Sequence, residues 1–446
     1  MMHEISQSVD QYRDLILAAE RDIWKTPETG YKEFKTSAYM AEKFRSLGYE
    51  LTMAEGITGF YTVVDTGREG PEVLVLGELD SILCPAHPDA DPTTGAVHSC
   101  GHNAQCAALL GVAAALRDER VLAKLSGRIR LCAVPAEELL ELEYRAELKK
   151  QGKIKYFGGK SEFLSRGYFD GVDLALMVHT STSYSTHGGS VGCLVKNITY
   201  HGKAAHAGSA PQDGKNALYA ANCGLNAVNA LRETFREKDC IRVHPIITRG
   251  GDMVNAIPET VTMESYVRGK TFEAIVRENE KVNRALCGAA LSLGNNIEIN
   301  DTPGYSPLVN APDMIDLADE AMALALPEVE FHRNDQYFST GSTDMGDLSS
   351  FMPVVHPYAG GACGNAHGND YRICDPEAAC VGSAKWQLAM LLLLLGNSAE
   401  RAKKIVENFE PTFPSAEAFL AYQDSLNRSG ERISYREDGS AEVHWK

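Results

Sequence analysis

The sequence has little positive charge for its length. Among 446 residues, 43 are Lys or Arg and 60 are Asp or Glu, which gives a formal net charge of −17 at pH 7. Because nucleic-acid phosphates require a basic surface, this balance argues against a nucleic-acid-binding protein. No Gly-x-Gly-x-x-Gly or Walker motif follows a predicted strand, so a dinucleotide-dependent or ATP-dependent enzyme is not expected either. A small, diffusible substrate is compatible with these absences.

Long hydrophobic runs are also missing. The longest glycine-free apolar run, Leu388 to Leu395, is far too short to span a bilayer and favours a buried helix. The chain starts MMHEISQSVDQYRD, without a basic segment followed by an apolar one, so we expect no signal peptide. The sequence therefore predicts a cytoplasmic protein with no membrane segment. Its 44% of hydrophobic residues is typical of globular proteins, and its length is sufficient for two domains.

The cysteines do not form the pattern of a disulfide framework. The sequence has 11 of them, an odd number, and they are widely scattered. In a reducing cytoplasm a free cysteine behaves as a small apolar residue. We therefore expect most of these cysteines to be buried thiols.

Residues 1–188 alternate between helical and extended patterns. Apolar residues at three- and four-residue intervals predict helices over 7–25 and 36–47, and a small-residue helix follows over 104–116. Short β-branched or apolar runs predict strands, namely 59–65, 73–79, 128–134 and 172–178. This alternation predicts an α/β domain with a central sheet flanked by helices.

The pattern changes at about residue 190. The predicted order strand, helix, strand, strand, helix, strand over 194–300 is that of a ferredoxin-like α+β unit. Because α/β patterning resumes at Asp313, we interpret 190–306 as a domain inserted into a split catalytic domain formed by 1–189 and 307–446. No chemistry can be assigned to the polar segment 400–446.

Two short clusters carry metal-binding or acid–base chemistry. Cys100 and His102 flank a glycine before the small-residue helix, and both residue types bind zinc. The alternative is a buried thiol beside an ordinary histidine. Glu137 and Glu138 follow the predicted strand 128–134, where one carboxylate could hold a metal and the other act as a general base. The alternative there is a solvated acidic turn.

Two further histidines lie at positions that are typical of active-site residues. His179 ends a predicted strand, where active sites of α/β proteins collect, and His367 lies in the glycine-rich loop Gly-Asn-Ala-His-Gly. Each could equally be a structural or solvent-exposed histidine. Each signal is weak alone, and the order of the four motifs carries the argument.

In that order the motifs resemble the aminoacylase/carboxypeptidase family of dinuclear metallopeptidases. The nearest branch includes hippurate hydrolases, indole-acetyl-amino-acid hydrolases, p-aminobenzoyl-glutamate hydrolase and the β-alanyl-lysine dipeptidase type. The matching motifs are Glu78-Leu-Asp80, His98-Ser-Cys-Gly-His102, Pro135-Ala-Glu-Glu138, His179, His206 and His367. The resemblance extends from about Pro27 to Leu395, nearly the whole chain.

The resemblance implies two divalent metal ions and their ligands. The residues that match ligand positions are Cys100, His102, Glu138, His179 and His367. Zinc or manganese is expected, and cobalt or nickel would also suit these donors. Glu137 matches the general base, and Asp80 matches an acid that orients a ligating histidine. Glu78 stands where close relatives have aspartate, so its role is open.

The resemblance also implies that the inserted domain is a lid and dimerisation domain. His206 matches a catalytic histidine that relatives receive from the partner subunit to stabilise the oxyanion, which implies a homodimer. Asn255 and Arg268 match positions that hold the substrate carboxylate, although a salt-bridged surface arginine is the alternative. Asp344 matches the p-aminobenzoyl-glutamate and β-alanyl-lysine branch, and Gly360 lies in a stretch expected to line the substrate cleft.

The predicted function is metal-dependent hydrolysis of an amide bond in a small N-acyl-amino acid or dipeptide with a free carboxylate. The alternative is a catalytically inactive metal-binding regulatory or scaffold protein on the same fold. A zinc deaminase is not expected, because the Pro-Cys-x-x-Cys signature is absent. Compared with this branch, residues 139–157 form an insertion directly after Glu138, which we expect to flank the cleft and alter substrate choice.

Overall fold

The computed structural model describes residues 7–445, which form two compact units. The first contains the described residues up to Gly189 together with Leu308–Phe338 and Thr343–Ala416. The second contains Ser190–Pro307, Ser339–Ser342 and the described residues from Glu417 onwards. The expectation about a signal peptide falls partly on residues 1–6, outside the described part of the chain.

The main sheet of the first unit has the strand order β1-β2-β6-β3-β7-β17. Its strands are β1 (Thr52–Met53), β2 (Phe60–Asp65), β6 (Arg128–Val134), β3 (Glu72–Glu78), β7 (Leu174–Leu176) and β17 (Val354–Val355). β6, β3, β7 and β17 run parallel, whereas β1 and β2 are antiparallel to their neighbours. The predicted α/β fold with a mixed sheet is thus confirmed. β3 is buried along its whole length, as expected for a parallel strand covered on both faces.

A second sheet and two short hairpins complete the strands of this unit. The sheet has the order β15-β9-β18-β8, with β16 paired to β9. Its members are β15 (Leu308–Val309), β9 (Tyr184–Ser190), β18 (Tyr358–Ala359), β8 (His179–Thr180) and β16 (Phe331–Ser339). The hairpins are β4 (Ile82–Leu83) with β5 (Ala96–Val97), and β19 (Ala362–Cys363) with β20 (Arg372–Ile373).

The central helix of the first unit is α4 (His102–Ala115), and all of its residues are buried. It packs against α2, α12 and β3, and its small residues allow this close approach. At Gly111 a Cβ atom would lie 2.7 Å from Ile16 and 2.9 Å from Ala384, so only glycine fits there. The remaining helices are α2 (Arg13–Trp24), α3 (Phe34–Ser46), α5 (Glu119–Leu122), α6 (Leu142–Lys150), α7 (Gly159–Ser165), α10 (Pro312–Ala325), α11 (Met345–Ser349), α12 (Ser383–Leu395) and α13 (Glu400–Asn408).

One helical segment is long and apolar enough to cross a membrane. Within the described residues this is Glu377–Leu395, a stretch that includes α12. Of its most apolar window, 78% is buried inside the protein, which is typical of a core helix.

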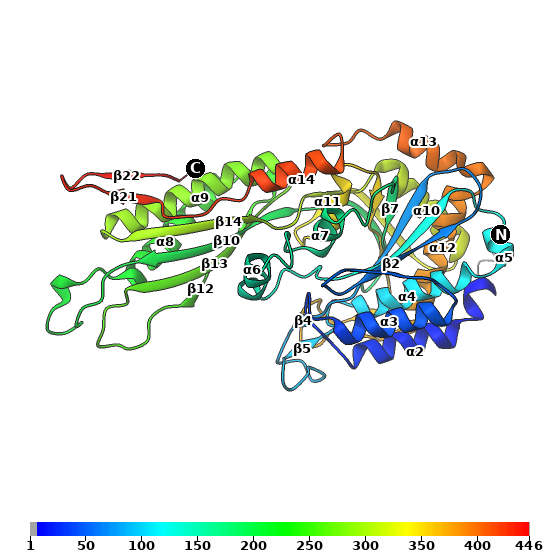
Figure 1. The fold of residues 1–446 in the computed structure, drawn as a ribbon, viewed down its shortest axis with the longest axis horizontal. Coiled ribbons are helices and arrows are strands. Elements are labelled where there is room, and N and C mark those ends of the chain that lie inside the picture. Colours follow the sequence, from blue (N-terminus) through cyan, green and yellow to red (C-terminus); the bar gives the residue numbers. More distant parts are fainter. Residues whose placement is uncertain (1–6, 446) are drawn as a thin grey trace. The chain divides into compact units, whose positions relative to one another are not determined.

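The second unit has the ferredoxin-like element order. Its strands and helices are β10 (Gly192–His201), α8 (Ala217–Leu231), β11 (Arg242–Val243), β12 (Ile246–Arg249), β13 (Thr260–Gly269), α9 (Phe272–Ser292) and β14 (Asn296–Pro303). The antiparallel sheet has the order β11-β13-β10-β14, with β12 also paired to β13. The helices α8 and α9 pack against each other and against β10 and β13 (Figure 1). Three strands, β11, β12 and β13, lie between the two helices, where the sequence predicts two.

The C-terminal segment lies with the second unit, whereas the sequence analysis assigned it to the split catalytic domain. The segment consists of α14 (Ala416–Ser425), β21 (Ile433–Tyr435) and β22 (Ala441–Val443). Arg428 and Asp301 exchange backbone hydrogen bonds, and Ile433 is buried in the core of this unit. The polar composition of the segment gave no signal for these contacts, because few of its residues, such as Phe419 and Ile433, are buried apolar ones.

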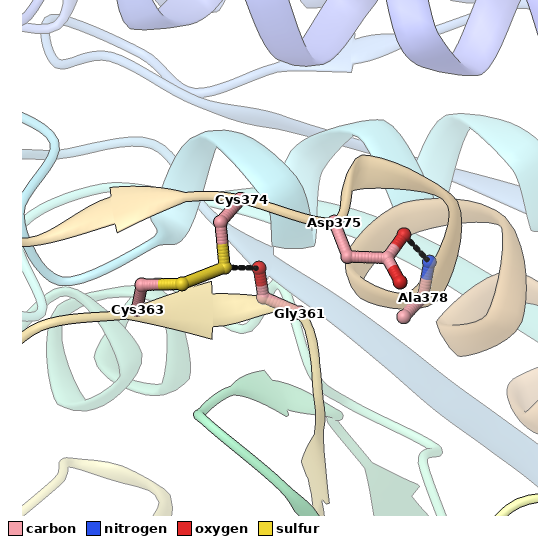
Figure 2. Close-up of a disulfide and its surroundings, with 5 residues drawn as sticks. All are labelled: Gly361, Cys363, Cys374, Asp375 and Ala378. Atoms are coloured by element: carbon pink, nitrogen blue, oxygen red, sulfur yellow. Dashed lines mark hydrogen bonds between the residues drawn. A yellow bond between two sulfur atoms is a disulfide. The ribbon is translucent and has the colours of Figure 1, made fainter.

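One disulfide stands among cysteines that are mostly free thiols, as the sequence predicts. Cys363 and Cys374 are bonded, and they close the β19–β20 hairpin (Figure 2). The other nine cysteines are free, and six of them are buried, as expected. Sequence spacing could not reveal the bonded pair, because the hairpin that brings the two residues together consists of two-residue strands.

Candidate active site

The candidate site lies at the carboxyl ends of the parallel strands of the first unit. β3 ends at Glu78, β6 is followed by Glu137 and Glu138, and His179 follows β7. In parallel sheets these strand ends lie at one edge, where ligand sites of α/β proteins form. Residues distant in sequence are therefore brought together by the strand order β6-β3-β7.

A tight glycine turn places Cys100 beside His102. Gly101 has a φ of +89°, a left-handed conformation that glycine adopts without strain. A Cβ atom there would lie 2.4 Å from Tyr371 Oη and 2.9 Å from Thr180 Cβ. His102 begins α4 directly after this turn, so Cys100 and His102 point towards one region.

Asp80 fixes the orientation of His102. Its backbone carbonyl oxygen lies 2.9 Å from His102 Nδ1, and its Oδ1 lies 3.3 Å from the same atom. Its Oδ2 accepts a hydrogen bond of 2.8 Å from the Glu138 backbone N–H. With Nδ1 donating to Asp80, Nε2 is left as the free donor atom for a metal ion. Asp80 therefore links two of the expected ligands.

The five expected ligands form two overlapping groups that share the Cys100 thiol. One group is Cys100, His102 and His179, and the other is Cys100, Glu138 and His367; in each, the donor atoms lie within 4.8 Å of one another. Cys100 Sγ lies 3.5 Å from His179 Nε2, and His367 Nε2 lies 3.0 Å from Glu138 Oε1. A tetrahedral zinc ion with bonds of about 2.3 Å to sulfur and about 2.0 Å to nitrogen separates such donors by about 3.5 Å. The distance of 3.5 Å between Cys100 Sγ and His179 Nε2 fits that geometry closely.

Burial and mutual repulsion perturb the anionic groups of the site. Burial, reinforced by Glu138 and Glu137, raises the pKa of the Cys100 thiol well above its usual value. Burial also raises the pKa of Glu137, and Glu78 and Glu138 add to this effect. Bound divalent cations would oppose both effects by stabilising thiolate and carboxylate. The concentration of buried acidic donors therefore fits a dinuclear cation site.

The histidines respond to the same surroundings in opposite ways. Burial alone lowers the pKa of His102, but Glu78 and Asp80 outweigh it and raise this pKa to about 9. Burial, helped by the neighbouring His102, lowers the pKa of His179 to about 4. His102 Nε2 is buried without a hydrogen-bond partner, which is the state expected of a metal-directed nitrogen. This orphaned atom supports the fit of a metal ion to the site.

Helix α6, within the inserted segment 139–157, contacts the loop that contains Glu137 and Glu138. The Arg145 side chain is 1% exposed and donates to the backbone carbonyl oxygens of Glu138 and Phe157, the latter at 2.7 Å. Its guanidinium lies 5.6 Å from the centre of the Tyr31 ring. The insertion therefore contacts the backbone of an expected metal ligand.

The loop that contains Glu137 has an unusual backbone conformation. Ala136, directly before Glu137, has a φ of +56°, and its N–H donates 2.8 Å to the buried Glu33 carboxylate. Thr58 Oγ1 also donates to Glu33, at 2.6 Å. Burial, with Asp80 nearby, raises the pKa of Glu33 to about 8. These contacts hold the strained turn that presents Glu137.

Asp344 and Gly360, the expected substrate-binding residues of the first unit, are buried. Asp344 is fully buried against Lys160, whose backbone N–H donates 3.0 Å to Asp344 Oδ2. Gly360 is buried, and a Cβ atom there would lie 3.0 Å from the Tyr184 ring. The glycine therefore permits a close approach of the backbone to this aromatic ring.

Three expected residues lie in the second unit. His206 is exposed, and its Nδ1 accepts hydrogen bonds of 3.1 Å from the backbone N–H groups of Gly208 and Ser209. The His206 and Asn255 loops lie side by side, because Ala207 N–H donates 3.0 Å to the Asn255 carbonyl oxygen. Arg268, which is half-buried, donates 3.2 Å to Ser342 Oγ, lies over the Tyr266 ring and has no ion-pair partner within the described residues.

Sequence reasoning missed three residues near the site. Arg145 lies in the insertion 139–157, Lys160 follows it closely, and His356 lies four residues before Gly360. His356 follows β17, is 1% exposed and has its ring 5.7 Å from that of His179. A lysine or arginine buried to this degree has no local sequence signal, because its burial depends on partners distant along the chain.

The model of peptidase family M20/M25/M40 matches residues 77–391 of the chain. The chain belongs to this family. The match includes all the residues of the two ligand groups, and the resemblance stated from the motifs is confirmed. The predicted class of enzyme, a dinuclear metal-dependent amidohydrolase or dipeptidase, is confirmed as well.

Characterised relatives of the M20 family match most of the chain. A Xaa-Arg dipeptidase of Mus musculus is 27% identical over 362 residues, which cover 79% of this chain and 78% of the relative. An indole-3-acetyl-aspartic acid hydrolase of Enterobacter agglomerans is 25% identical over 367 residues, covering 70% and 79%. An N-acetyl-L-cysteine deacetylase of Bacillus subtilis is 26% identical over 323 residues, covering 69% and 71%.

Solved structures share the fold. A dinuclear metal-binding peptidase of the M20 family from Bacillus subtilis superposes with a TM-score of 0.64 at 20% identity, covering 86% of this chain and 99% of that structure. An aminobenzoyl-glutamate utilization protein from Klebsiella pneumoniae gives a TM-score of 0.66 at 19% identity, covering 87% and 98%. The two-domain α/β architecture of the family is therefore that of this chain.

Proposed function

We propose that this M20-family enzyme hydrolyses the amide bond of a small N-acyl-amino acid or dipeptide that has a free carboxylate. The observation that carries the proposal is the position of Glu137 beside two overlapping groups of metal donors that share Cys100. A proton-transferring carboxylate beside a dinuclear site is the arrangement required for hydrolysis by water.

We infer a separate task for each residue of the site. The proposed ligands of the two divalent ions are Cys100, His102, Glu138, His179 and His367. Such ions, when bound, supply Lewis acidity and bring the pKa of a water molecule towards neutrality. Glu137 accepts the proton of the attacking water and donates it to the leaving nitrogen. Asp80 keeps His102 and Glu138 oriented through the contacts described above.

The donor set supports zinc as the resident metal, with manganese as the second choice. A thiolate and three imidazoles are borderline or soft donors that suit zinc, whereas cobalt and nickel are accepted by the same donors. Nine of the cysteines within residues 7–445 are free, and this predominance of thiols supports our assignment of the enzyme to the cytoplasm. The Cys363–Cys374 disulfide is the one feature more typical of an oxidising compartment.

We assign substrate recognition partly to the second unit and to a homodimer formed through it. With His206 Nδ1 accepting two backbone hydrogen bonds, its Nε2 is the protonated nitrogen and can donate to an oxyanion of the partner subunit's substrate. Arg268 and Asn255 are proposed to bind the substrate carboxylate, a role to which a guanidinium without an ion-pair partner in the described part of the chain is suited.

The proposal is tested with metal-stripped and metal-restored protein on a panel of N-acyl-amino acids and dipeptides. Release of a free amino acid only after metal is restored supports it. The E137Q variant should keep its metal content but lose about 10²–10⁴-fold in kcat, the contribution typical of a general base. No hydrolysis across the panel by metal-loaded wild type would favour an inactive metal-binding scaffold instead.

A further inference from the structure

The Glu78 carboxylate has one oxygen committed to a cation and one oxygen free. Glu78 is the last residue of β3 and is fully buried. Its Oε1 accepts a hydrogen bond of 2.6 Å from Lys160 Nζ. Its Oε2 has no hydrogen-bond partner and lies 3.3 Å from His102 Nε2. A buried carboxylate oxygen without a donor is costly, so this atom calls for a partner of another kind.

Lys160 and Asp344 fix the direction in which Glu78 points. Lys160 lies near the start of α7, is fully buried, and its ammonium group bonds to both Glu78 Oε1 and Asp344 Oδ1. Asp344 Oδ2 in turn accepts 3.0 Å from the Lys160 backbone N–H. Because Asp344 accepts hydrogen bonds from both the backbone N–H and the ammonium of Lys160, this ammonium has little freedom to move. Glu78 Oε2 is therefore held towards His102.

The spacing of the free atoms matches that of two donors on one metal ion. Zinc–nitrogen and zinc–oxygen bonds of about 2.0–2.1 Å at a tetrahedral angle separate two donor atoms by about 3.3–3.4 Å. Glu78 Oε2 and His102 Nε2 are 3.3 Å apart, and both lack hydrogen-bond partners. Glu78, His102 and Glu137 also form a third group whose donor atoms lie within 4.8 Å of one another.

We propose that Glu78 Oε2 is a further metal ligand, which joins His102 on one of the two ions, and that Lys160 and Asp344 are its positioning residues. This inference rests on the dinuclear site of the proposed function. It gives one ion an additional hard oxygen donor, and the buried ammonium offsets part of the extra negative charge. Lys160 orients the carboxylate and does not touch the substrate.

The decisive variant is E78Q, because glutamine keeps the shape of the side chain and an oxygen acceptor for Lys160 but loses the anionic ligand. The matched control is E72Q. Glu72 is the first residue of the same strand and is 1% exposed, and it pairs with Arg128 and Arg130. Both substitutions thus neutralise a buried, cation-paired carboxylate at opposite ends of β3.

The readout is the affinity of the apo-protein for zinc in competition with a chromophoric chelator. E78Q should weaken one of the two zinc sites about 100-fold, since even residues behind the ligands cost 10–100-fold in metal affinity. E72Q should bind both ions as wild type does. Equal affinities in E78Q and wild type would overturn the proposal, and failure of wild type to bind two ions would overturn the proposed function itself.

A double-mutant cycle tests the positioning role of Lys160. K160M should weaken the same zinc site, and the E78Q/K160M double variant should be no weaker than E78Q, because both changes act through one carboxylate. Fully additive losses would show that Lys160 acts independently of Glu78.

If the variants do not fold, the crystal structure of the zinc-loaded wild type shows whether Glu78 is a ligand. A Glu78 Oε2–zinc distance of about 2.0–2.2 Å supports the ligand role, and a carboxylate that does not contact zinc refutes it.

Discussion

Replacement of Arg145 by methionine should destabilise the protein and weaken its metal site together. Methionine is of similar length and apolar, so R145M removes the charge and the donors with little loss of volume. The guanidinium is 1% exposed and donates to the carbonyl oxygens of Phe157 and Glu138. The variant leaves both buried carbonyl groups without these donors.

The size of the effect follows from those contacts. A hydrogen bond from a charged donor contributes about 1.5–3 kcal/mol, and Arg145 makes two of them besides its contact with the Tyr31 ring. The desolvation of the guanidinium, which the variant no longer requires, offsets part of the loss. We expect the free energy of unfolding to fall by about 3–5 kcal/mol. Because Glu138 is a proposed ligand, metal affinity should fall about 10–100-fold.

Urea unfolding of apo-protein and zinc competition assays measure the two quantities separately. The control is R120M, which removes a 76% exposed side chain whose ion pair with Asp118 lies at the surface. Such pairs contribute about 0–1 kcal/mol, so R120M should unfold nearly as wild type does. If R145M matched R120M in stability, Arg145 would not anchor the insertion. If stability fell while zinc affinity was unchanged, the insertion would not support Glu138.

Two further predictions concern the disulfide and a buried carboxyl. Replacing Cys363 and Cys374 by serine should lower the free energy of unfolding by about 3 kcal/mol, the chain-entropy value for a short closed loop. Urea unfolding under oxidising conditions measures this loss, and an unchanged unfolding midpoint would contradict the prediction. Burial raises the pKa of Glu20 to about 7, with Asn103 as its hydrogen-bond donor. The folded state thus holds this proton more tightly than the unfolded state, so Glu20 by itself should lower the free energy of unfolding by roughly 2–3 kcal/mol as the pH rises from about 4.5 through 7. E20Q should lack this loss in urea titrations at pH 5 and pH 8, and parallel pH profiles would refute the assignment.

The disulfide prediction also bears on the metal site. His367 lies inside the loop that the Cys363–Cys374 bond closes, with a φ of +64° and its N–H donating 2.8 Å to the Ser99 carbonyl oxygen. The bond therefore limits the freedom of a loop that carries a proposed ligand. The sequence predicted the ligand but not its covalent support.

The sequence alone determined the secondary structure of the sheet regions and the order of the chemical groups. Arg128–Val134 is β6 as predicted, and the small-residue helix predicted over 104–116 is α4, His102–Ala115. Apolar periodicity and turn residues are local properties, so they can be read without the tertiary structure. The motif that contains Cys100 and His102 likewise depends on one glycine turn, which is encoded locally.

Only the tertiary structure decided which charged groups act together. Lys160 reaches Glu78 and Asp344, and Arg145 reaches back to the carbonyl group of Glu138. The partners Lys160 and Asp344 are separated by 184 residues, and a single sequence contains no signal for so distant a pairing. A buried charge is tolerated only where such partners meet it, and their meeting is a property of the packed sheet and helices. The proposed role of Glu78 beyond the expected five ligands became visible only there.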